Sequence, residues 1–220
     1  SSKLSLLQGV SASGKSYVYL HLAKACLVKG KRFLLLLPEG SLVPAMVELF
    51  KEHFGELVGV YHAQMSAREE MSELLDYLEG KYPIMITTRK GLFLPLEDVE
   101  IMVLDECQDD GYLSKHPYFH GLELAFFYGR QGKTHVVLGS ATPPLALLQQ
   151  EDLHLIRLDE PYHERQVEIE LLDMRRELSE GNRSPLSRSL MQAIHSTMKK
   201  EGLTFLLMNK RLYASYIFCR

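Results

Sequence analysis

The eight residues from Gly9 to Ser16, Gly-Val-Ser-Ala-Ser-Gly-Lys-Ser, constrain this chain more than any other feature. They match the phosphate-cradling pattern G-x-x-x-x-G-K-[ST], and they lie where it requires, between the apolar run 4–7 and a segment of helical periodicity. An accidental match in a glycine-punctuated turn is the alternative, but the strand-then-helix setting favours a nucleoside triphosphate site. The residues expected to hold the phosphates are Gly9, Ser11, Ala12, Ser13, Gly14, Lys15 and Ser16.

The overall charge excludes a protein whose whole surface attracts nucleic acid. The 25 basic and 28 acidic residues give a formal net charge of −3, so any contact with DNA must be local. The three cysteines, Cys26, Cys107 and Cys219, are scattered and indicate reduced thiols in the cytosol. The apolar run 34–37 is far shorter than the ~20 residues of a membrane helix, so we expect no membrane partner. We also find no signal peptide.

Short apolar segments alternate with longer amphipathic ones over the first two thirds of the chain. This alternation is typical of parallel strands joined by crossover helices. We predict strands at 4–8, 33–37, 57–61, 83–87, 100–104 and 134–138. We predict helices at 15–29, 41–54, 66–79 and 119–129, and Ser66 with Glu69 forms a capping box at the third. Because strands this apolar need cover on both faces, the pattern predicts an α/β fold with a doubly wound, mainly parallel sheet.

The pattern changes after Asp152. We predict a turn at 159–161 and a strand at 166–172, followed by a loop at 175–183. A helix at 186–198 and a strand at 203–208 then follow. This is the beginning of a second α/β unit without its remainder. Because the chain opens at Ser1 directly before a strand and ends abruptly at Arg220, we expect a piece of a longer protein.

Two adjacent acids stand where such a fold places a metal site. The apolar strand 101–104 ends in Asp105 and Glu106, and side chains at successive positions of a strand point in different directions. One carboxylate can hold magnesium together with the Ser16 hydroxyl, and we assign this role to Asp105. Glu106 then orients the attacking water, with Lys15 as the second catalytic residue. The alternative is a solvated acidic turn, but the phosphate loop favours a hydrolytic site.

A third motif, at 139–143, follows the strand 134–138 and reads Gly-Ser-Ala-Thr-Pro. Its two hydroxyls can bond a neighbouring loop, although the turn formers alone would explain a tight strand-to-helix connection. The order of the motifs, a phosphate loop, an Asp-Glu strand and a Ser-Ala-Thr turn, resembles the first motor lobe of a superfamily 2 helicase. The resemblance implies that Ser140, Ala141 and Thr142 couple the nucleotide site to movement.

Further segments resemble one family of superfamily 2, the PriA primosomal helicases that restart replication in bacteria. The stretch from Pro38 to Met46 is similar to the "PE-x-x-L-x-P-Q-M" of that family. Counterparts of other family segments follow in the same order at 60–62, 88–96, 117–120, 173–177 and 209–214. The resemblance therefore extends over nearly the whole chain.

The resemblance implies an ATP-dependent 3′–5′ DNA helicase of the bacterial cytoplasm, with ATP and Mg²⁺ as cofactors. Single-stranded or forked DNA is the implied substrate, and primosome and single-strand-binding proteins are implied partners of the intact family member. The implied organisation is a RecA-like P-loop NTPase lobe at 1–158, a linker at 159–166 and the start of a second motor lobe at 167–220.

Two further sites follow from the resemblance alone. Thr88 and Arg89 match a family loop that touches the DNA backbone, and a solvated surface pair of Arg89 with Lys90 is the alternative. Cys219 matches the first zinc-ligand cysteine of the family. Its partner would lie beyond Arg220, so zinc is expected only in the intact family member.

The chain departs from the family pattern at the acidic motif. The family's "DEEH" reads Asp-Glu-Cys-Gln at 105–108, so an amide replaces the histidine expected to link the ATP site to the Ser-Ala-Thr turn. This puts coupling in doubt more than ATP binding. Gln108 still donates and accepts hydrogen bonds, so we count it among the catalytic residues. We expect Cys107 to be a packing residue.

Two alternatives to a PriA-type motor stay open. One is a different superfamily 2 translocase, such as a repair or restriction motor. The other is a nucleic-acid or protein interaction module that has kept the motor fold and lost turnover, which Gln108 and the modest basic content support. The resemblance places the arginine finger and the adenine-recognising residues outside this chain, so we expect the chain alone to bind nucleotide weakly and hydrolyse it poorly.

Overall fold

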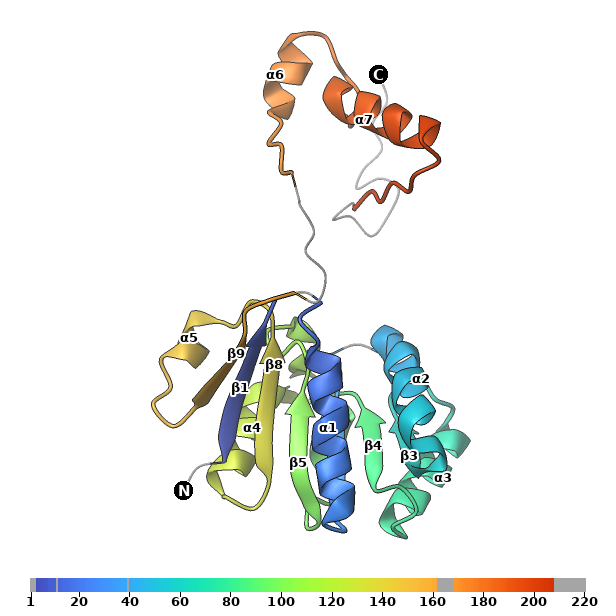
Figure 1. Ribbon diagram of the computed structural model, residues 1–220, viewed down its shortest axis with the longest axis vertical. Coiled ribbons are helices and arrows are strands. Elements are labelled where there is room, and N and C mark those ends of the chain that lie inside the picture. The colour runs from blue at the N-terminus through green and yellow to red at the C-terminus, as the bar shows by residue number, and fades with distance from the viewer. Residues whose placement is uncertain (1–2, 11, 39, 162–167, 208–220) are drawn as a thin grey trace. The chain divides into compact units, whose positions relative to one another are not determined.

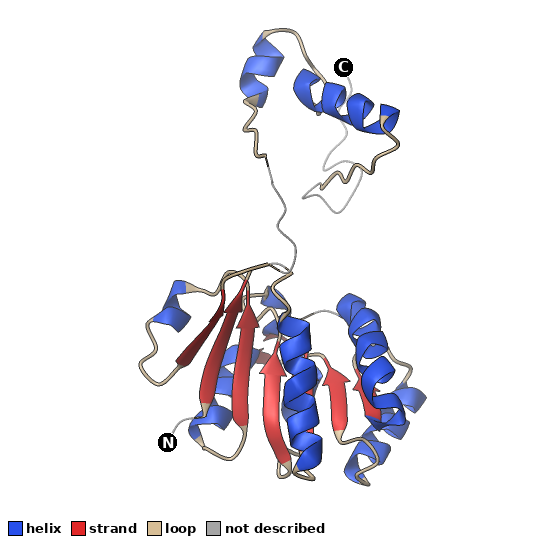
Figure 2. Cartoon of the chain, in the orientation of Figure 1, coloured by secondary structure: helices blue, strands red, loops and turns tan. Residues whose placement is uncertain are grey.

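The computed structural model describes residues 3–10, 12–38, 40–161 and 168–207. The chain divides into two compact units, Ser1–Glu164 and Arg165–Arg220, which Figures 1 and 2 show. Among the described residues, no helix combines the length and the apolar character needed to span a bilayer.

A seven-stranded sheet in the order β3-β4-β2-β5-β8-β1-β9 forms the centre of the first unit, and all of its pairings are parallel. Its strands are β1 (Leu4–Gly9), β2 (Arg32–Leu36), β3 (Val58–Tyr61), β4 (Ile84–Thr87), β5 (Val99–Leu104), β8 (His135–Ser140) and β9 (His154–Leu158). The doubly wound parallel sheet that the sequence predicts is confirmed. The edge strand β9 was not predicted.

Helices cover both faces of this sheet. On one face lie α1 (Lys15–Val28) and α2 (Val43–Phe54), drawn in front of the sheet in Figure 1. The opposite face packs against α3 (Ala67–Leu78), α4 (Gly121–Arg130) and the short α5 (Leu145–Leu148). Successive residues of β2 separate to the two faces, since Phe33 packs with the α1 side and Leu34 with the α4 side. This two-sided burial is why the strands read as continuous apolar runs.

Local signals set the ends of the helices. The Ser66 hydroxyl accepts a hydrogen bond from the Glu69 amide at 3.3 Å, and the Glu69 carboxylate accepts one from the Ser66 amide at 2.9 Å. The predicted capping box is therefore present at the start of α3. Gly55 and Gly80 follow α2 and α3 with positive φ, where a residue without Cβ is least strained.

The segment between β5 and α4 contains structure that the sequence did not predict. It holds a two-stranded antiparallel hairpin of β6 (Leu113–Lys115) and β7 (Tyr118–His120), preceded by a short 3-10 helix at Asp110–Tyr112. Strands of three residues are too short to show period-two alternation, so the pattern gave no signal.

The second unit differs from prediction. The helix α7 (Arg188–Lys199) is present, but α6 (Met174–Ser179) stands where we predicted a loop at 175–183, because the Asp173 carboxylate caps it by accepting from the Arg175 amide at 2.9 Å. The strands predicted at 166–172 and 203–208 are absent from their described parts, 168–172 and 203–207. A strand needs a neighbour for its backbone groups, and no pairing reaches these described stretches.

The strand order positions the site. The strands β5, β8 and β1 are adjacent, and at their carboxyl ends come the Asp-Glu pair, the Ser-Ala-Thr turn and the phosphate loop. Ligands of open parallel sheets bind outside the carboxyl ends of the strands. The three motifs therefore meet at one edge of the sheet.

Candidate active site

The loop between β1 and α1 has the backbone that its sequence pattern requires. Gly14 lies at φ 87°, in the left-handed region that glycine adopts without strain, and α1 begins at the next residue. Ala12 also lies at positive φ, 61°. The Ser13 amide donates to the Val10 carbonyl at 3.1 Å and closes a turn ahead of the helix.

The interior of this loop fits an anionic ligand. A Cβ at Gly9 would collide with Ser13 Oγ and lie 3.1 Å from Lys15 Cγ, so only glycine leaves the cradle open. Ser13 Oγ is buried and has no hydrogen-bond partner among the described residues. Because a buried hydroxyl without a partner is uncommon, an acceptor oxygen of a bound phosphate is the natural missing partner.

Lys15 connects the loop to the acidic motif. Its Nζ donates to the Gly9 carbonyl at 3.0 Å and lies 3.7 Å from Glu106 Oε1, with the side chain only 11% exposed. Glu106 follows β5 in the left-handed region at φ 45° and keeps 35% of its side chain exposed. The predicted catalytic pair is therefore in contact, and solvent water can reach the carboxylate.

Asp105 is held by a residue that the sequence analysis missed. The buried Tyr19 hydroxyl donates to Asp105 Oδ1 at 2.7 Å. Burial raises the pKa of the Asp105 carboxyl, and the hydrogen bond from Tyr19 opposes that rise. Burial, reinforced by the Asp105 charge, raises the pKa of Tyr19 well above its usual range, so Tyr19 stays a donor. The spacing of one helical turn places Tyr19 on the same face of α1 as Lys15, but no sequence pattern pairs it with Asp105.

Hard oxygen donors for magnesium are available at this position. Asp105 offers a carboxylate at the end of β5, and Ser16 offers a hydroxyl in the first turn of α1. Oxygen ligands of this kind suit Mg²⁺ when it is bound with a nucleotide's phosphates. The donor set and the open cradle fit a magnesium nucleotide.

Gln108 links the acidic motif to the Ser-Ala-Thr turn. Its Nε2 donates to Glu106 Oε2 at 2.7 Å, and its Oε1 accepts from Ser140 Oγ at 2.6 Å. Ser140 Oγ in turn accepts from the Thr142 amide at 3.0 Å. With the contact between Lys15 and Glu106, an unbroken series of polar contacts runs from the phosphate loop to Thr142, through the residue that departs from the family pattern. Ala141 lies within the turn and carries no polar side-chain atom.

Cys107, between the two acids and the glutamine, takes no part in that series. Its amide donates to the Gly139 carbonyl at 2.9 Å, which joins the carboxyl ends of β5 and β8. Burial raises the pKa of the Cys107 thiol to about 12, so the thiol stays protonated at neutral pH. The residue packs, as the sequence led us to expect.

Comparison with known families decides the class of protein. The sequence model of the family described as "DEAD/DEAH box helicase" matches residues 2–150. The chain belongs to the DEAD/DEAH box helicase family. The matched region contains the phosphate loop, the acidic motif and the Ser-Ala-Thr turn.

Among curated proteins, this helicase-family chain is similar to replication restart proteins PriA. It is 36% identical to that of Bacillus subtilis over 99% of the chain, and 34% identical to that of Synechocystis over 98%. The resemblance to PriA is therefore confirmed over nearly the whole chain. The chain spans 28% and 27% of the length of these two relatives.

Solved structures show the same fold. The Pyrococcus furiosus Hef helicase domain matches with a TM-score of 0.53 at 21% identity, over 73% of this chain and 36% of that one. Saccharomyces cerevisiae Dbp5 matches with a TM-score of 0.52 at 14% identity, over 70% of this chain and 41% of that one. These likenesses confirm the RecA-like helicase fold.

The DEAD/DEAH box helicase chain places Thr88 and Arg89 apart from the nucleotide loop. They follow β4, and they line a cavity of about 380 Å³ whose other walls include the hairpin residues Ser114 and His116. We call it the hairpin cavity. The Arg89 Nη1 donates to the Gly111 carbonyl at 2.9 Å, whereas Thr88 is buried. Arg89 thus contacts the segment that leads into the hairpin.

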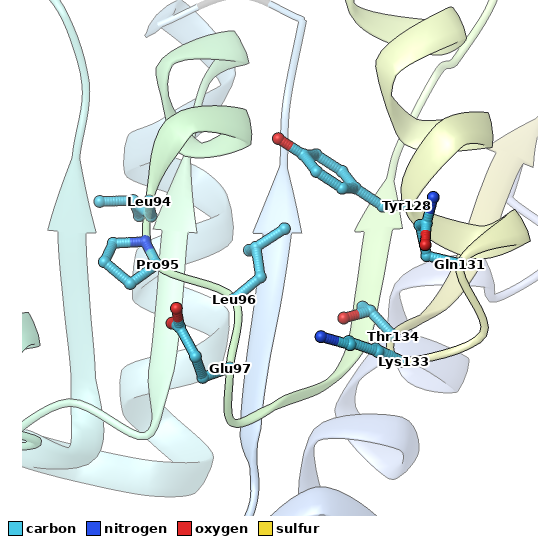
Figure 3. Close-up of a pocket in the computed structure, with 8 residues that line it drawn as sticks. All are labelled: Leu94, Pro95, Leu96, Glu97, Tyr128, Gln131, Lys133 and Thr134. Carbon is cyan, nitrogen blue, oxygen red and sulfur yellow. The ribbon is translucent and has the colours of Figure 1, made fainter.

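A second cavity of this helicase fold, about 340 Å³, has none of the predicted site residues in its lining, and Figure 3 shows the side chains that line it. Leu96 precedes β5 and Thr134 precedes β8, so it opens at the amino ends of the strands. The Tyr128 hydroxyl beside it donates to the Leu92 carbonyl at 2.8 Å, and the Thr134 hydroxyl donates to the Val99 carbonyl at 3.0 Å. These groups are satisfied by the fold itself.

Two predicted site residues, Ser11 and Cys219, lie outside the described residues. Within the described ranges, no group of three or more His, Cys, Asp or Glu side chains is arranged to hold a metal ion.

Proposed function

We propose that this chain is the nucleotide-binding part of an ATP-driven DNA helicase of the PriA replication-restart type, moving 3′ to 5′ on single-stranded or forked DNA. The observation that carries the proposal is the unbroken series of contacts from Lys15 through Glu106 and Gln108 to Ser140. Such a series is what a motor needs to connect its nucleotide to a loop that moves.

The phosphate loop would hold the triphosphate. Lys15, now satisfied by the Gly9 carbonyl and by Glu106, would turn to the β and γ oxygens, and the Ser13 hydroxyl would gain its missing acceptor. Ser16 and Asp105 would hold Mg²⁺, which when bound neutralises charge on the phosphates. Tyr19 keeps the Asp105 carboxylate oriented for that role.

Glu106 would orient the attacking water. Without nucleotide, one of its oxygens lies near Lys15 and the other accepts from Gln108. When Lys15 turns to the phosphates, Gln108 would still hold the second oxygen, and the first oxygen would be free to accept from the attacking water. After transfer of the phosphoryl group to water and release of inorganic phosphate, Lys15 would lose that partner and return to Glu106. A shift of the Glu106 carboxylate would then move the Gln108 amide through their hydrogen bond, and Gln108 would move the Ser140 hydroxyl in the same way.

The DNA would be contacted at the hairpin cavity. Arg89 supplies an exposed guanidinium at the carboxyl end of β4, beside the buried Thr88, and a charged group of this kind positions a phosphodiester backbone. The net charge of −3 requires a local contact of this kind. We further propose residues 1–158 as the first motor lobe, 159–166 as the linker and 167–220 as the start of the second lobe. Primosome and single-strand-binding proteins in the bacterial cytoplasm would be partners of the whole protein.

An ATPase assay on the full-length protein with and without forked DNA tests this function. Wild-type turnover should rise with DNA, and Lys15→Ala should abolish it. Lys24→Ala is the matched control, because Lys24 is an exposed lysine of the same helix α1 and should leave turnover unchanged. Wild-type turnover no greater than that of Lys15→Ala would sink the motor and favour an interaction module on the same fold.

A further inference from the structure

The proposed site leaves one conspicuous side chain near the phosphate loop without a role. Tyr17 is the third residue of α1, two positions after Lys15, and it is 63% exposed. Its amide donates to the Gly14 carbonyl at 3.0 Å, which fixes it in the first turn of the helix. Among the described residues, its phenol ring has no hydrogen bond or ring contact. An aromatic ring left in water next to a phosphate loop calls for an explanation.

The direction in which a bound nucleotide must extend follows from the acidic residues. Hydrolysis occurs at the γ-phosphate, so that phosphate lies at the Glu106 end of the site. The ribose and base must then lie on the other side of the loop, away from Asp105 and Glu106. Tyr19 points from α1 to Asp105. Residues two positions apart on a helix are about 200° apart around its axis, so Tyr17 lies on the side of α1 opposite to that contact.

The rest of α1 agrees with this placement. Tyr19, Leu20 and Ala23 are buried against the sheet, whereas Tyr17 and His21 belong to the exposed face of the helix. On that face Tyr17 lies in the turn nearest the loop, and His21 lies one turn farther away. The first turn of α1 carries no acidic residue that would repel a nucleotide.

We propose that Tyr17 is a nucleoside-binding residue, whose ring packs against the ribose and base of the nucleotide held by the phosphate loop. The inference rests on the proposed function. A phenol ring offers a flat apolar face, and a stacked base contributes the equivalent of about a 5- to 150-fold change in affinity. Because every base has a π-face, Tyr17 favours a nucleoside over bare phosphates but does not choose adenine over guanine.

Calorimetric titration of the full-length protein with Mg²⁺–ADP, Mg²⁺–GDP and Mg²⁺–tripolyphosphate tests this. Tyr17→Ala should weaken ADP and GDP alike, by about 5- to 150-fold, and leave tripolyphosphate affinity unchanged. Tyr17→Phe should retain nucleotide affinity, because the ring and not the hydroxyl makes the contact. His21→Ala is the matched control, one turn along the same exposed face, and should change nothing.

The outcomes separate this inference from the function on which it rests. If Tyr17→Ala leaves ADP affinity unchanged while Lys15→Ala abolishes binding of ADP and tripolyphosphate, the nucleoside contact is wrong and the phosphate site stands. If Tyr17→Ala weakens ADP and tripolyphosphate equally, Tyr17 only supports the loop, and the inference is again overturned. If Lys15→Ala leaves ADP binding intact, the proposed phosphate site itself is wrong.

Discussion

The Ser140 hydroxyl donates to Gln108 Oε1 at 2.6 Å, and this contact fixes the polarity of the whole series that joins the nucleotide site to the turn after β8. An ionised Glu106 can only accept, so the Gln108 amide must turn its Nε2 to Glu106 and its Oε1 to Ser140. Ser140 must then donate, which leaves its oxygen free to accept from Thr142. The Glu106 carboxylate thus sets the direction of the hydrogen bonds that reach the Ser-Ala-Thr turn after β8.

A glutamine in this position can transmit orientation but not a proton, which leads to the first prediction. Gln108→Leu keeps the approximate side-chain size and removes both hydrogen bonds. In full-length protein we expect nucleotide affinity to persist and DNA stimulation of the ATPase to fall about 5- to 150-fold, which corresponds to the loss of hydrogen bonds worth ~1–3 kcal/mol. Gln149→Leu, at an exposed glutamine after α5, is the control. Retained DNA stimulation in Gln108→Leu would contradict the coupling role.

Asp105 combines a stability cost with a binding role. Its pKa is raised in the folded protein, so between its unfolded and folded pKa values the folded state holds more protons, and stability falls as pH rises through that window. Asp105→Asn removes the buried charge and should therefore raise the melting temperature at neutral pH while weakening Mg²⁺–ADP binding. The gain should shrink as pH falls through the folded pKa and vanish below about pH 4. Melting temperatures of Asp105→Asn and wild type measured across this pH range test both the gain at neutral pH and its loss at low pH. The exposed Asp110→Asn is the control.

Ala12 occupies a position that suits glycine. At φ 61° an L-residue carries ~1–2 kcal/mol of strain, which a glycine would relieve. Glycine also gives the unfolded chain more conformational entropy, which lowers the net gain by ~0.5–1 kcal/mol. We expect Ala12→Gly to raise the free energy of unfolding by about 0.5–1 kcal/mol in a urea titration. Ala25→Gly, at an exposed position in the C-terminal half of α1, should change it by about −1 kcal/mol. Equal effects at both positions would show that the loop does not hold this conformation in solution.

The parallel sheet of the first unit can be predicted from the sequence, because the same pattern, an apolar strand followed by a polar or small loop, repeats along the chain. Every central strand is apolar on both faces and ends in a loop with polar or small residues, so the sheet and the convergence of its three motifs follow from pattern alone. The strand β9 carries a weaker signal because four of its five residues are exposed at the sheet edge. Contacts between motifs are different, because no pattern in α1 indicates that Tyr19 donates a hydrogen bond to Asp105 at the end of β5.

In the described part of the second unit, a strand-like sequence pattern is present without a strand. Residues 168–172 alternate like a strand, but alternation describes only which side chains would share a face. Whether a strand forms depends on a neighbouring strand, and the described residues pair none with this segment. The helix α6 depends on one cap at Asp173, which a reading by periodicity overlooks in a six-residue element.

Gly139 is required by the tyrosine that holds Asp105. A Cβ at Gly139 would collide with the Tyr19 hydroxyl and lie 3.0 Å from Asp105 Oδ1. We expect Gly139→Ala to lower stability by about 1–3 kcal/mol. The double variant Gly139→Ala with Tyr19→Phe should recover at least about 1 kcal/mol of that loss, because the colliding oxygen is gone. Strictly additive urea-unfolding energies across the four proteins would refute this packing relationship.

Arg89 contacts the segment before the hairpin and also offers a positive charge at the hairpin cavity, and these two roles can be separated. For single-stranded DNA bound to the full-length protein, Arg89→Ala should weaken affinity and reduce the slope of log affinity against log salt by about 1. Arg68→Ala, at an exposed arginine on α3, should leave the slope unchanged.

Arg89→Lys decides which role matters for DNA. The ammonium keeps the charge but lacks the planar fork of guanidinium donors, one of which reaches the Gly111 carbonyl. If phosphate contact dominates, Arg89→Lys should retain the wild-type salt slope and most of the affinity, since lysine also binds phosphate as a point charge. If the slope survives but the affinity falls as far as in Arg89→Ala, then Arg89 acts mainly by positioning the hairpin through Gly111. A wild-type slope in Arg89→Ala would remove Arg89 from the DNA contact altogether.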